Sequence, residues 1–199
     1  MMTTTQIDSF VVPVIGLAQQ GCGFFVGNYF ITAGHVIGDG EFSPSIVFEG
    51  KRIVLDKNKA LKVCYSEQIS GDESESDFAV FAVDGINSPL KLADYKPLAG
   101  QVLRCITYET VVQKDEMNGT LEIFATKEEI VTVNCTATVR EETLGNFFAC
   151  DTDSILKKGN SGSPVIDSDN NVVGILRGGT YLPECCIFQY AGVIKELIE

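Results

Sequence analysis

Gly159-Asn160-Ser161-Gly162-Ser163-Pro164 is the stretch around which the rest of the chain is interpreted. It holds a serine between two glycines, and an apolar run follows it from Val165. A turn of this kind can present a hydroxyl, and its backbone N–H groups can converge on one point and stabilise a developing oxyanion. The same residue types also build ordinary loops. The hexapeptide alone therefore leaves a catalytic turn and a simple loop equally open.

Composition and charge exclude several classes of protein. The 199 residues are 45% hydrophobic and 21% charged, which is typical of a globular protein. No apolar run approaches the roughly 20 residues that a membrane-spanning helix requires. The net charge of −12 repels nucleic acid and anionic membranes. We therefore expect neither as a partner, and the oligomeric state stays open.

The cysteine pattern favours buried, reduced thiols. The number of cysteines is odd, no Cys-x-x-Cys motif occurs, and most of them lie in apolar runs, at positions 22, 64, 105, 135, 150, 185 and 186. This fits neither a disulfide framework nor a zinc site. The N-terminus lacks the basic segment and apolar core of a secretory signal. We expect a reducing, cytoplasmic location and no zinc site, and a redox role for the adjacent pair Cys185-Cys186 stays open.

Short apolar runs separated by turn signals extend along most of the chain. Examples are Phe10–Leu17 and Ile130–Arg140, and Gly27-Asn28 is a two-residue hairpin signal. Gly192–Glu199 instead has apolar residues at helical spacing. About a dozen strands with one terminal helix predict an all-β barrel or sandwich.

The serine requires a base, and the chain offers one histidine. A serine hydroxyl is a weak nucleophile unless a base activates it, and a carboxylate commonly holds that base in one tautomer. His35 follows a strand-like run in a turn of small residues, although a lone histidine is more often structural. Asp77 ends an acidic loop and begins the apolar run Phe78–Val83, so it is the candidate carboxylate. Taken alone, it would be interpreted as an acid at the edge of a strand.

The order His35, Asp77, Ser161 distinguishes between classes of hydrolase. In α/β-hydrolases the histidine follows the serine, and here no histidine follows Ser161. No cysteine occupies a Gly-x-Cys-Gly turn, which argues against a cysteine peptidase. The order matches that of chymotrypsin.

Three motifs together resemble the signatures of chymotrypsin/trypsin-like serine peptidases. They are Thr32-Ala33-Gly34-His35, Asp77-Phe78-Ala79-Val80 and the Ser161 hexapeptide. Thr152-Asp153 before the hexapeptide most resembles HtrA/DegP-like peptidases. Gly174-Ile175, leading to Gly178-Gly179, is similar to viral 3C-like peptidases.

The resemblance implies an all-β fold of two antiparallel six-stranded barrels with a short C-terminal helix. Residues 6–95 would form the first barrel, residues 101–190 the second, and residues 192–199 the helix. Ser161 would be the nucleophile, His35 the general base and then acid, and Asp77 the orienting carboxylate. The backbone N–H groups of Gly159 and Ser161 would form the oxyanion hole, and the resemblance implies that neither a metal nor another cofactor is required.

The residues at the expected substrate-selecting positions differ from those of trypsin and of 3C-like peptidases. Ile155 falls where trypsin is acidic, which argues against a basic P1 residue. Leu176 falls where 3C-like peptidases carry the histidine that reads glutamine. An aliphatic or small P1 residue is therefore expected, and Gly178 and Gly179 would pair with an extended substrate. A turn is the alternative interpretation of the two glycines.

Asn160 stands where digestive enzymes carry an aspartate that pairs with a newly cut N-terminus. The resemblance therefore implies a loop that is competent without such processing.

The expected function is that of a serine endopeptidase acting on proteins or peptides through an acyl-enzyme. The alternative is a catalytically silent protease-like fold that binds or regulates.

Overall fold

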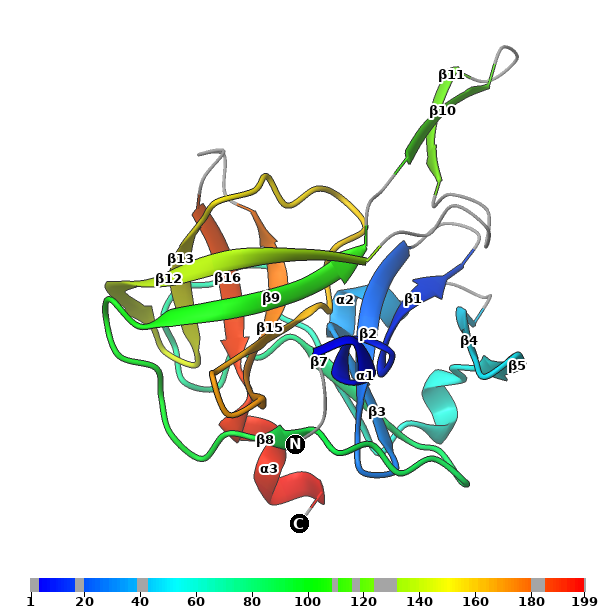
Figure 1. Ribbon diagram of the computed structural model, residues 1–199, viewed down its shortest axis with the longest axis horizontal. Coiled ribbons are helices and arrows are strands. Elements are labelled where there is room, and N and C mark those ends of the chain that lie inside the picture. The colour runs from blue at the N-terminus through cyan, green and yellow to red at the C-terminus, as the bar shows by residue number, and fades with distance from the viewer. Residues whose placement is uncertain are drawn as a thin grey trace.

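The computed structural model shows two β-sheets packed side by side, with short helices at their margins (Figure 1). It describes residues 4–16, 20–38, 43–108, 111–115, 119–123, 132–179 and 185–198. The predicted all-β class with a short C-terminal helix is confirmed.

The N-terminal sheet has seven antiparallel strands in the order β5-β4-β1-β2-β3-β7-β6. In chain order they are β1 (Val11–Ile15), β2 (Gln20–Val26), β3 (Tyr29–Thr32), β4 (Ser45–Phe48), β5 (Lys51–Val54), β6 (Lys62–Cys64) and β7 (Phe78–Ala82). The expected strand Phe10–Leu17 thus appears as β1, and its Leu17 lies outside the described residues.

The second sheet closes into a six-stranded antiparallel barrel. Its ring runs β14-β9-β12-β13-β16-β15, and a pairing between β14 and β15 closes it. The strands are β9 (Val102–Tyr108), β12 (Thr132–Leu144), β13 (Phe147–Thr152), β14 (Pro164–Ile166), β15 (Asn171–Gly179) and β16 (Cys185–Tyr190). Of the expected strand Ile130–Arg140, residues 130 and 131 lie outside the described residues. β8 (Lys91–Leu92), which the expected first unit included, pairs in parallel with β15.

The two halves are therefore a closed barrel and an open half-barrel, within the chymotrypsin-like two-barrel fold. Among the described residues no pairing joins β5 to β6, the two edge strands of the N-terminal sheet. Both strands are mostly exposed and carry Lys51, Arg52 and Lys62. Charged side chains on an edge strand oppose further pairing, which explains why this sheet stays open. The domain boundaries expected from the sequence stay a prediction.

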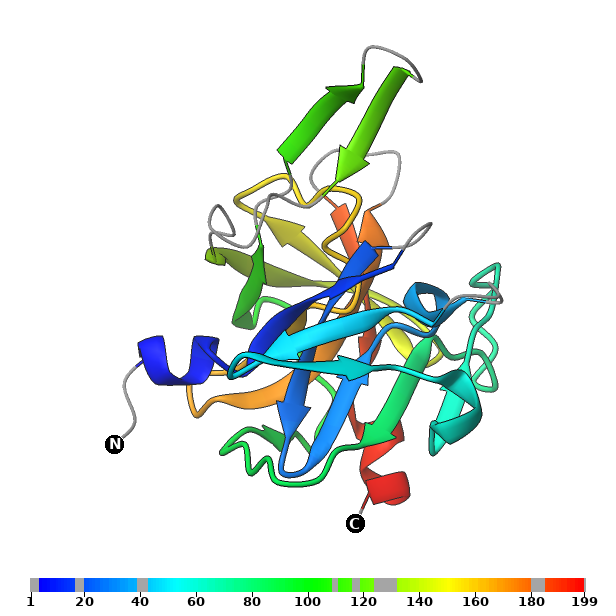
Figure 2. The same ribbon diagram turned by 90° about the vertical axis from the view of Figure 1, so that its right-hand side faces the viewer.

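Three helices, one 3₁₀ turn and a separate hairpin complete the described chain. They are α1 (Thr4–Asp8), α2 (Gly34–Ile37), η1 (Lys57–Lys59), α3 (Gly192–Ile198), β10 (Val111–Asp115) and β11 (Gly119–Ile123). The C-terminal helix was predicted, and Glu199 at its end lies outside the described residues. The β10–β11 hairpin projects away from both sheets (Figures 1 and 2).

Apolar side chains from both halves meet in one buried cluster. Phe24 and Ile31 of the N-terminal sheet pack there with Ile106 and Ile175 of the barrel. Each half also has a cluster of its own. Burial of this kind contributes roughly 1.5–3 kcal/mol per large aliphatic or aromatic side chain. The shared cluster therefore fixes the position of residues from one sheet relative to the other.

Six of the seven cysteines are buried, as the sequence predicted, and Cys64 is half-buried. Burial raises the pKa of the thiols of Cys22, Cys150 and Cys186. Because the thiolate is the reactive form, these groups should be slow to alkylate. We expect iodoacetamide near pH 8 to label Cys64 first, and the buried thiols only after denaturation, as peptide mass mapping would show. Rapid labelling of several thiols in the folded protein would contradict this.

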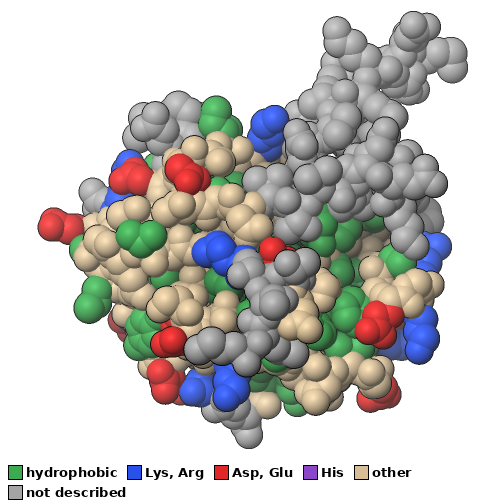
Figure 3. Space-filling model, viewed as in Figure 1, with side chains coloured by type: hydrophobic (Ala, Val, Ile, Leu, Met, Phe, Trp, Pro, Cys, Tyr) green, Lys and Arg blue, Asp and Glu red, His purple; other side chains and the backbone are tan. Residues whose placement is uncertain are grey.

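Acidic and basic side chains are scattered over the face shown in Figure 3, and no large patch of one sign covers its described residues.

Candidate active site

A glycine with no room for a side chain places His35 beside Asp77. β3 ends at Thr32, and α2 begins at Gly34. A Cβ atom on Gly34 would lie 1.8 Å from the carbonyl oxygen of Cys64 and 3.1 Å from Asp77 Oδ1. The tight approach of α2 to β6 and β7 therefore requires glycine here and brings His35 to the start of β7.

His35 and Asp77 are joined by two hydrogen bonds. The Nδ1 atom of His35 lies 2.7 Å from Asp77 Oδ2, and the His35 amide donates to Asp77 Oδ1 over 2.9 Å. Because an ionised carboxylate only accepts, the imidazole proton resides on Nδ1, and Nε2 is left as an acceptor. The Asp77 side chain is 0% exposed, whereas that of His35 is 30% exposed. The partly exposed ring thus keeps a basic nitrogen that is not used by Asp77.

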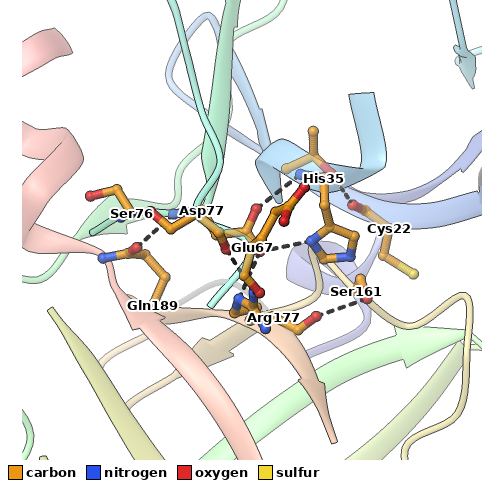
Figure 4. Close-up of polar contacts among 10 residues, drawn as sticks. Cys22, His35, Glu67, Ser76, Asp77, Ser161, Arg177 and Gln189 are labelled. Carbon is orange, nitrogen blue, oxygen red and sulfur yellow. Dashed lines mark hydrogen bonds and ion pairs between the residues drawn. The ribbon is translucent and has the colours of Figure 1, made fainter. Parts of the chain in front are cut away.

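Asp77 is held from its backbone side as well. Its amide donates to Oε1 of Gln189, a fully buried residue of β16, over 2.9 Å. This contact crosses from the N-terminal half to the barrel (Figure 4). The sequence predicts that Asp72, Glu73 and Glu75 of the preceding loop stay solvated. Asp72 and Glu73 are exposed, whereas Glu75 is partly buried because it accepts hydrogen bonds from Ser70 and Gly71.

The Ser161 turn is confined between two strands. The amide of Cys22 on β2 donates to the Ser161 carbonyl over 2.6 Å, and the amide of Gly162 donates to the carbonyl of Leu176 on β15 over 2.7 Å. Gly162 has φ +89°, and a Cβ atom there would lie 2.0 Å from the Cys22 carbonyl oxygen. Glycine is therefore required by both backbone conformation and space.

In this conformation the Ser161 hydroxyl is turned toward the barrel. Its Oγ donates to the carbonyl of Arg177 over 3.0 Å. In the part of the chain that the structure describes, no hydrogen bond joins Ser161 to His35, although Figure 4 shows the serine next to the imidazole ring. The structure thus pairs two of the three predicted residues and places the third beside them.

The turn that leads into Ser161 leaves two backbone amides without a protein acceptor in the described chain. Gly159 has φ +98°. Within the described chain, neither the Gly159 amide nor the Ser161 amide donates to a protein acceptor. The Cys22 thiol contacts the Gly159 carbonyl at 3.5 Å, and burial raises the pKa of that thiol, which keeps it a neutral donor. Two unused N–H groups next to a hydroxyl can accommodate an oxyanion.

Asn160 holds this turn in place. Its side chain accepts from the Lys157 amide and donates from Nδ2 to the Tyr108 carbonyl, both over 2.7 Å. Asn160 is 4% exposed. The amide side chain is matched to one donor and one acceptor, a pattern that a carboxylate cannot satisfy.

We expect Asn160→Asp to impair both stability and activity. The new carboxylate oxygen would face the Tyr108 carbonyl in a buried site, which should lower the free energy of unfolding by about 1–3 kcal/mol. Displacement of the turn should lower kcat/KM by roughly tenfold or more. Urea unfolding and peptide hydrolysis measure the two effects. Asn28→Asp at an exposed hairpin turn is the matched control, and equal behaviour of both variants would contradict the account.

The predicted substrate-binding residues fall in different environments. Ile155, in the loop after β13, is 67% exposed. Leu176 is 1% exposed and packs inside the barrel, because β15 lies between β14 and β16 and turns that side chain inward. Gly178 and Gly179 belong to β15 and pair with β16, so the alternative interpretation as a turn is wrong. A Cβ atom on Gly178 would meet open space.

Two residues of the site were missed from the sequence. Arg177 lies with its Nε atom 3.5 Å from Asp77 Oδ2, and Gln189 supports the Asp77 amide. Each is a polar residue on a mostly apolar strand, Gln189 buried and Arg177 partly buried, and this is the only signal that the sequence offers. Their shared partner, Asp77, lies in the other half of the chain and is identified only by the structure.

Two features of the described chain concern metal ligands and membrane-spanning helices. Across these residues, no cluster of three or more histidine, cysteine, aspartate or glutamate side chains could hold a metal ion. None of the described helices has the length and apolar character needed to cross a membrane.

Comparison with known proteins finds a family model that matches most of the chain. The family model described as the trypsin-like peptidase domain matches residues 21–175, which include His35, Asp77 and Ser161. No curated protein matches the sequence.

Solved structures of proteases share the fold at low identity. The Rv3671c protease of M. tuberculosis, in an inactive form, is 18% identical with a TM-score of 0.64, over 98% of this chain and 87% of that one. Tobacco etch virus protease in complex with product is 13% identical with a TM-score of 0.66, over 98% and 80%. A Glu endopeptidase is 16% identical with a TM-score of 0.65, over 99% and 93%.

Proposed function

Because this chain belongs to the trypsin-like peptidase family, we propose that it is a serine endopeptidase with Ser161 as nucleophile. The observation that carries the proposal is the bonded His35–Asp77 pair beside Ser161, at 2.7 Å between Nδ1 and Oδ2. The pair leaves Nε2 of His35 free to take a proton from the serine hydroxyl.

The reaction would proceed through an acyl-enzyme. Oγ of Ser161 attacks the peptide carbonyl carbon while its proton passes to Nε2 of His35. The resulting imidazolium gives that proton to the leaving amine as the C–N bond breaks. Water, deprotonated by His35, then cleaves the ester and restores Ser161. Asp77 stays ionised and stabilises the imidazolium in both steps.

The amides of Gly159 and Ser161 would stabilise the oxyanion. Donors that already point at the developing charge need no reorganisation when the reaction occurs. The contacts of Asn160 and the buried Cys22 thiol support this turn from behind.

The turned hydroxyl of Ser161 favours a second candidate, a silent protease-like module. A hydroxyl that donates to the Arg177 carbonyl is not aligned for transfer to His35. Catalytic hydrogen bonds, however, often form only when a substrate is bound. We therefore place the enzyme first.

The substrate would be an extended peptide with an aliphatic or small P1 residue. The open space at Gly178 supports pairing of a substrate strand along the end of β15. The exposed apolar side chain of Ile155 supports the P1 preference.

Cleavage of a proteome-derived peptide library tests the function and the preference together. We expect new termini with the wild-type chain and none with Ser161→Ala, and the P1 residues should be small or aliphatic. An absence of new termini would favour the silent module, and cleavage after Arg, Lys or Gln would overturn the preference.

A further inference from the structure

Arg177 is a charged residue in a largely buried place, and the proposed reaction gives it no role. It follows Leu176 on β15, and its side chain is 22% exposed. Its Nε atom lies 3.5 Å from Asp77 Oδ2, the same oxygen that bonds His35 Nδ1 at 2.7 Å. Figure 4 shows the guanidinium beside Asp77 and the Arg177 carbonyl next to Ser161.

The outer part of the guanidinium is bonded to the N-terminal half. Its Nη2 atom donates to the carbonyls of Ser66 over 2.8 Å and Glu67 over 3.0 Å. These two residues belong to the loop between β6 and β7, and that loop ends at Asp77. A single side chain from the barrel thus fixes both the carboxylate and the start of the loop that leads to it.

The buried carboxylate needs a positive neighbour. Asp77 is 0% exposed, and an ionised carboxylate away from water is costly unless it is paired. Its ion pairs in the described structure are with His35 and Arg177. Because His35 must be neutral to act as a base, Arg177 is the permanent cation of the two.

The Nε atom of Arg177 has no hydrogen-bond partner, although it is buried. Hydrogen bonds between nitrogen and oxygen have lengths of about 2.7–3.2 Å, so a small displacement would convert the 3.5 Å contact into a bond. This buried donor therefore faces one oxygen of the carboxylate at a distance just beyond a hydrogen bond.

We propose that Arg177 is a positioning residue, whose guanidinium holds Asp77 Oδ2 against Nδ1 of His35 and excludes water from that pair. This inference rests on the proposed function, because it concerns the same site. Arg177 does not touch the reacting atoms through its side chain and acts through Asp77.

Two substitutions of Arg177 distinguish the effect of its positive charge from the effect of its guanidinium shape. Arg177→Met removes the charge and keeps an apolar chain, whereas Arg177→Lys keeps the charge but cannot form the guanidinium fork. Arg52→Met is the matched control, since Arg52 lies on the exposed edge strand β5. Circular dichroism establishes that each variant is folded, and if Arg177→Met is not, Arg177→Lys carries the test.

One readout does not depend on activity. His35 is the only histidine of the chain, so proton NMR reports its Nδ1 proton without ambiguity. We expect a far-downfield signal from this proton in the wild type and in Arg52→Met. In Arg177→Met, water should reach the His35–Asp77 pair and broaden the signal beyond detection. Arg177→Lys should keep a weakened signal.

Loss of the Arg177 guanidinium should also displace Asp77 from His35, and this displacement should change the kinetics. We expect Arg177→Met to lower kcat by roughly 10- to 100-fold with KM within about twofold, and Arg177→Lys to recover part of the loss. An unchanged Nδ1 signal in Arg177→Met would overturn the proposal, and so would a loss that appears in KM alone. If the wild type hydrolyses no peptide, the proposed function fails, whereas the NMR comparison still decides the role of Arg177.

Discussion

Ser161→Ala is expected to lower kcat by roughly 10⁴- to 10⁶-fold, with the fold and KM preserved. The substitution removes the atom that attacks the carbonyl, and neither His35 nor the turn amides can replace it. The lost hydroxyl makes one hydrogen bond, to the Arg177 carbonyl, so the stability cost should be about 1 kcal/mol or less.

Steady-state hydrolysis of a peptide identified in the library measures this effect. Ser168→Ala, at an exposed serine in the turn between β14 and β15, is the matched control and should retain wild-type rates. Retention of more than a few per cent of activity by Ser161→Ala would show that the nucleophile lies elsewhere.

Asp77→Asn should lower kcat by roughly 10⁴-fold while its size and position are conserved. Asp77 accepts from His35 through both oxygens, from Nδ1 at 2.7 Å and from the backbone amide at 2.9 Å. An asparagine has one oxygen, so one of these contacts must face an NH₂ group. If Nδ1 of His35 faces it, the imidazole proton moves to Nε2, and His35 can no longer accept the proton of Ser161.

Kinetics at several pH values test this, with Asp72→Asn as control, since Asp72 is an exposed acid of the same loop. The NMR signal of the His35 Nδ1 proton should disappear in Asp77→Asn and persist in Asp72→Asn. Wild-type activity in Asp77→Asn would contradict the assigned role.

The parts of the site that could be predicted from the sequence are the residues that lie in short motifs. Gly34 precedes His35 because α2 approaches β6 too closely for a side chain, and Gly162 follows Ser161 because the turn presses on β2. Asp77 was recognisable because a carboxylate opened an apolar run. In each case a steric or polar requirement is met by residues that are adjacent in the sequence. The all-β fold was predictable for a similar reason, because alternating apolar residues within each strand are also a local pattern.

The rest depends on contacts between residues distant in the sequence. Arg177 and Gln189 reach Asp77 across 100 and 112 positions, and no local pattern specifies such a partner. The inward direction of the Leu176 side chain follows from closure of the barrel. The N-terminal sheet stays open because its edge strands, β5 and β6, carry charged side chains, and which strands lie at the edges is known only once the strand order is known. The position of the Ser161 hydroxyl is likewise set by β15, through the Arg177 carbonyl.

Ser161 is proposed to be a nucleophile that His35 activates. A fluorophosphonate reacts with an activated serine, so labelling of the folded protein, followed by peptide mass mapping, examines this chemistry without a substrate. We expect one adduct per chain, located on Ser161, lost in Ser161→Ala and strongly slowed in Asp77→Asn. A folded wild-type chain that forms no adduct, or one that carries it on another residue, would rule out Ser161 as the activated nucleophile.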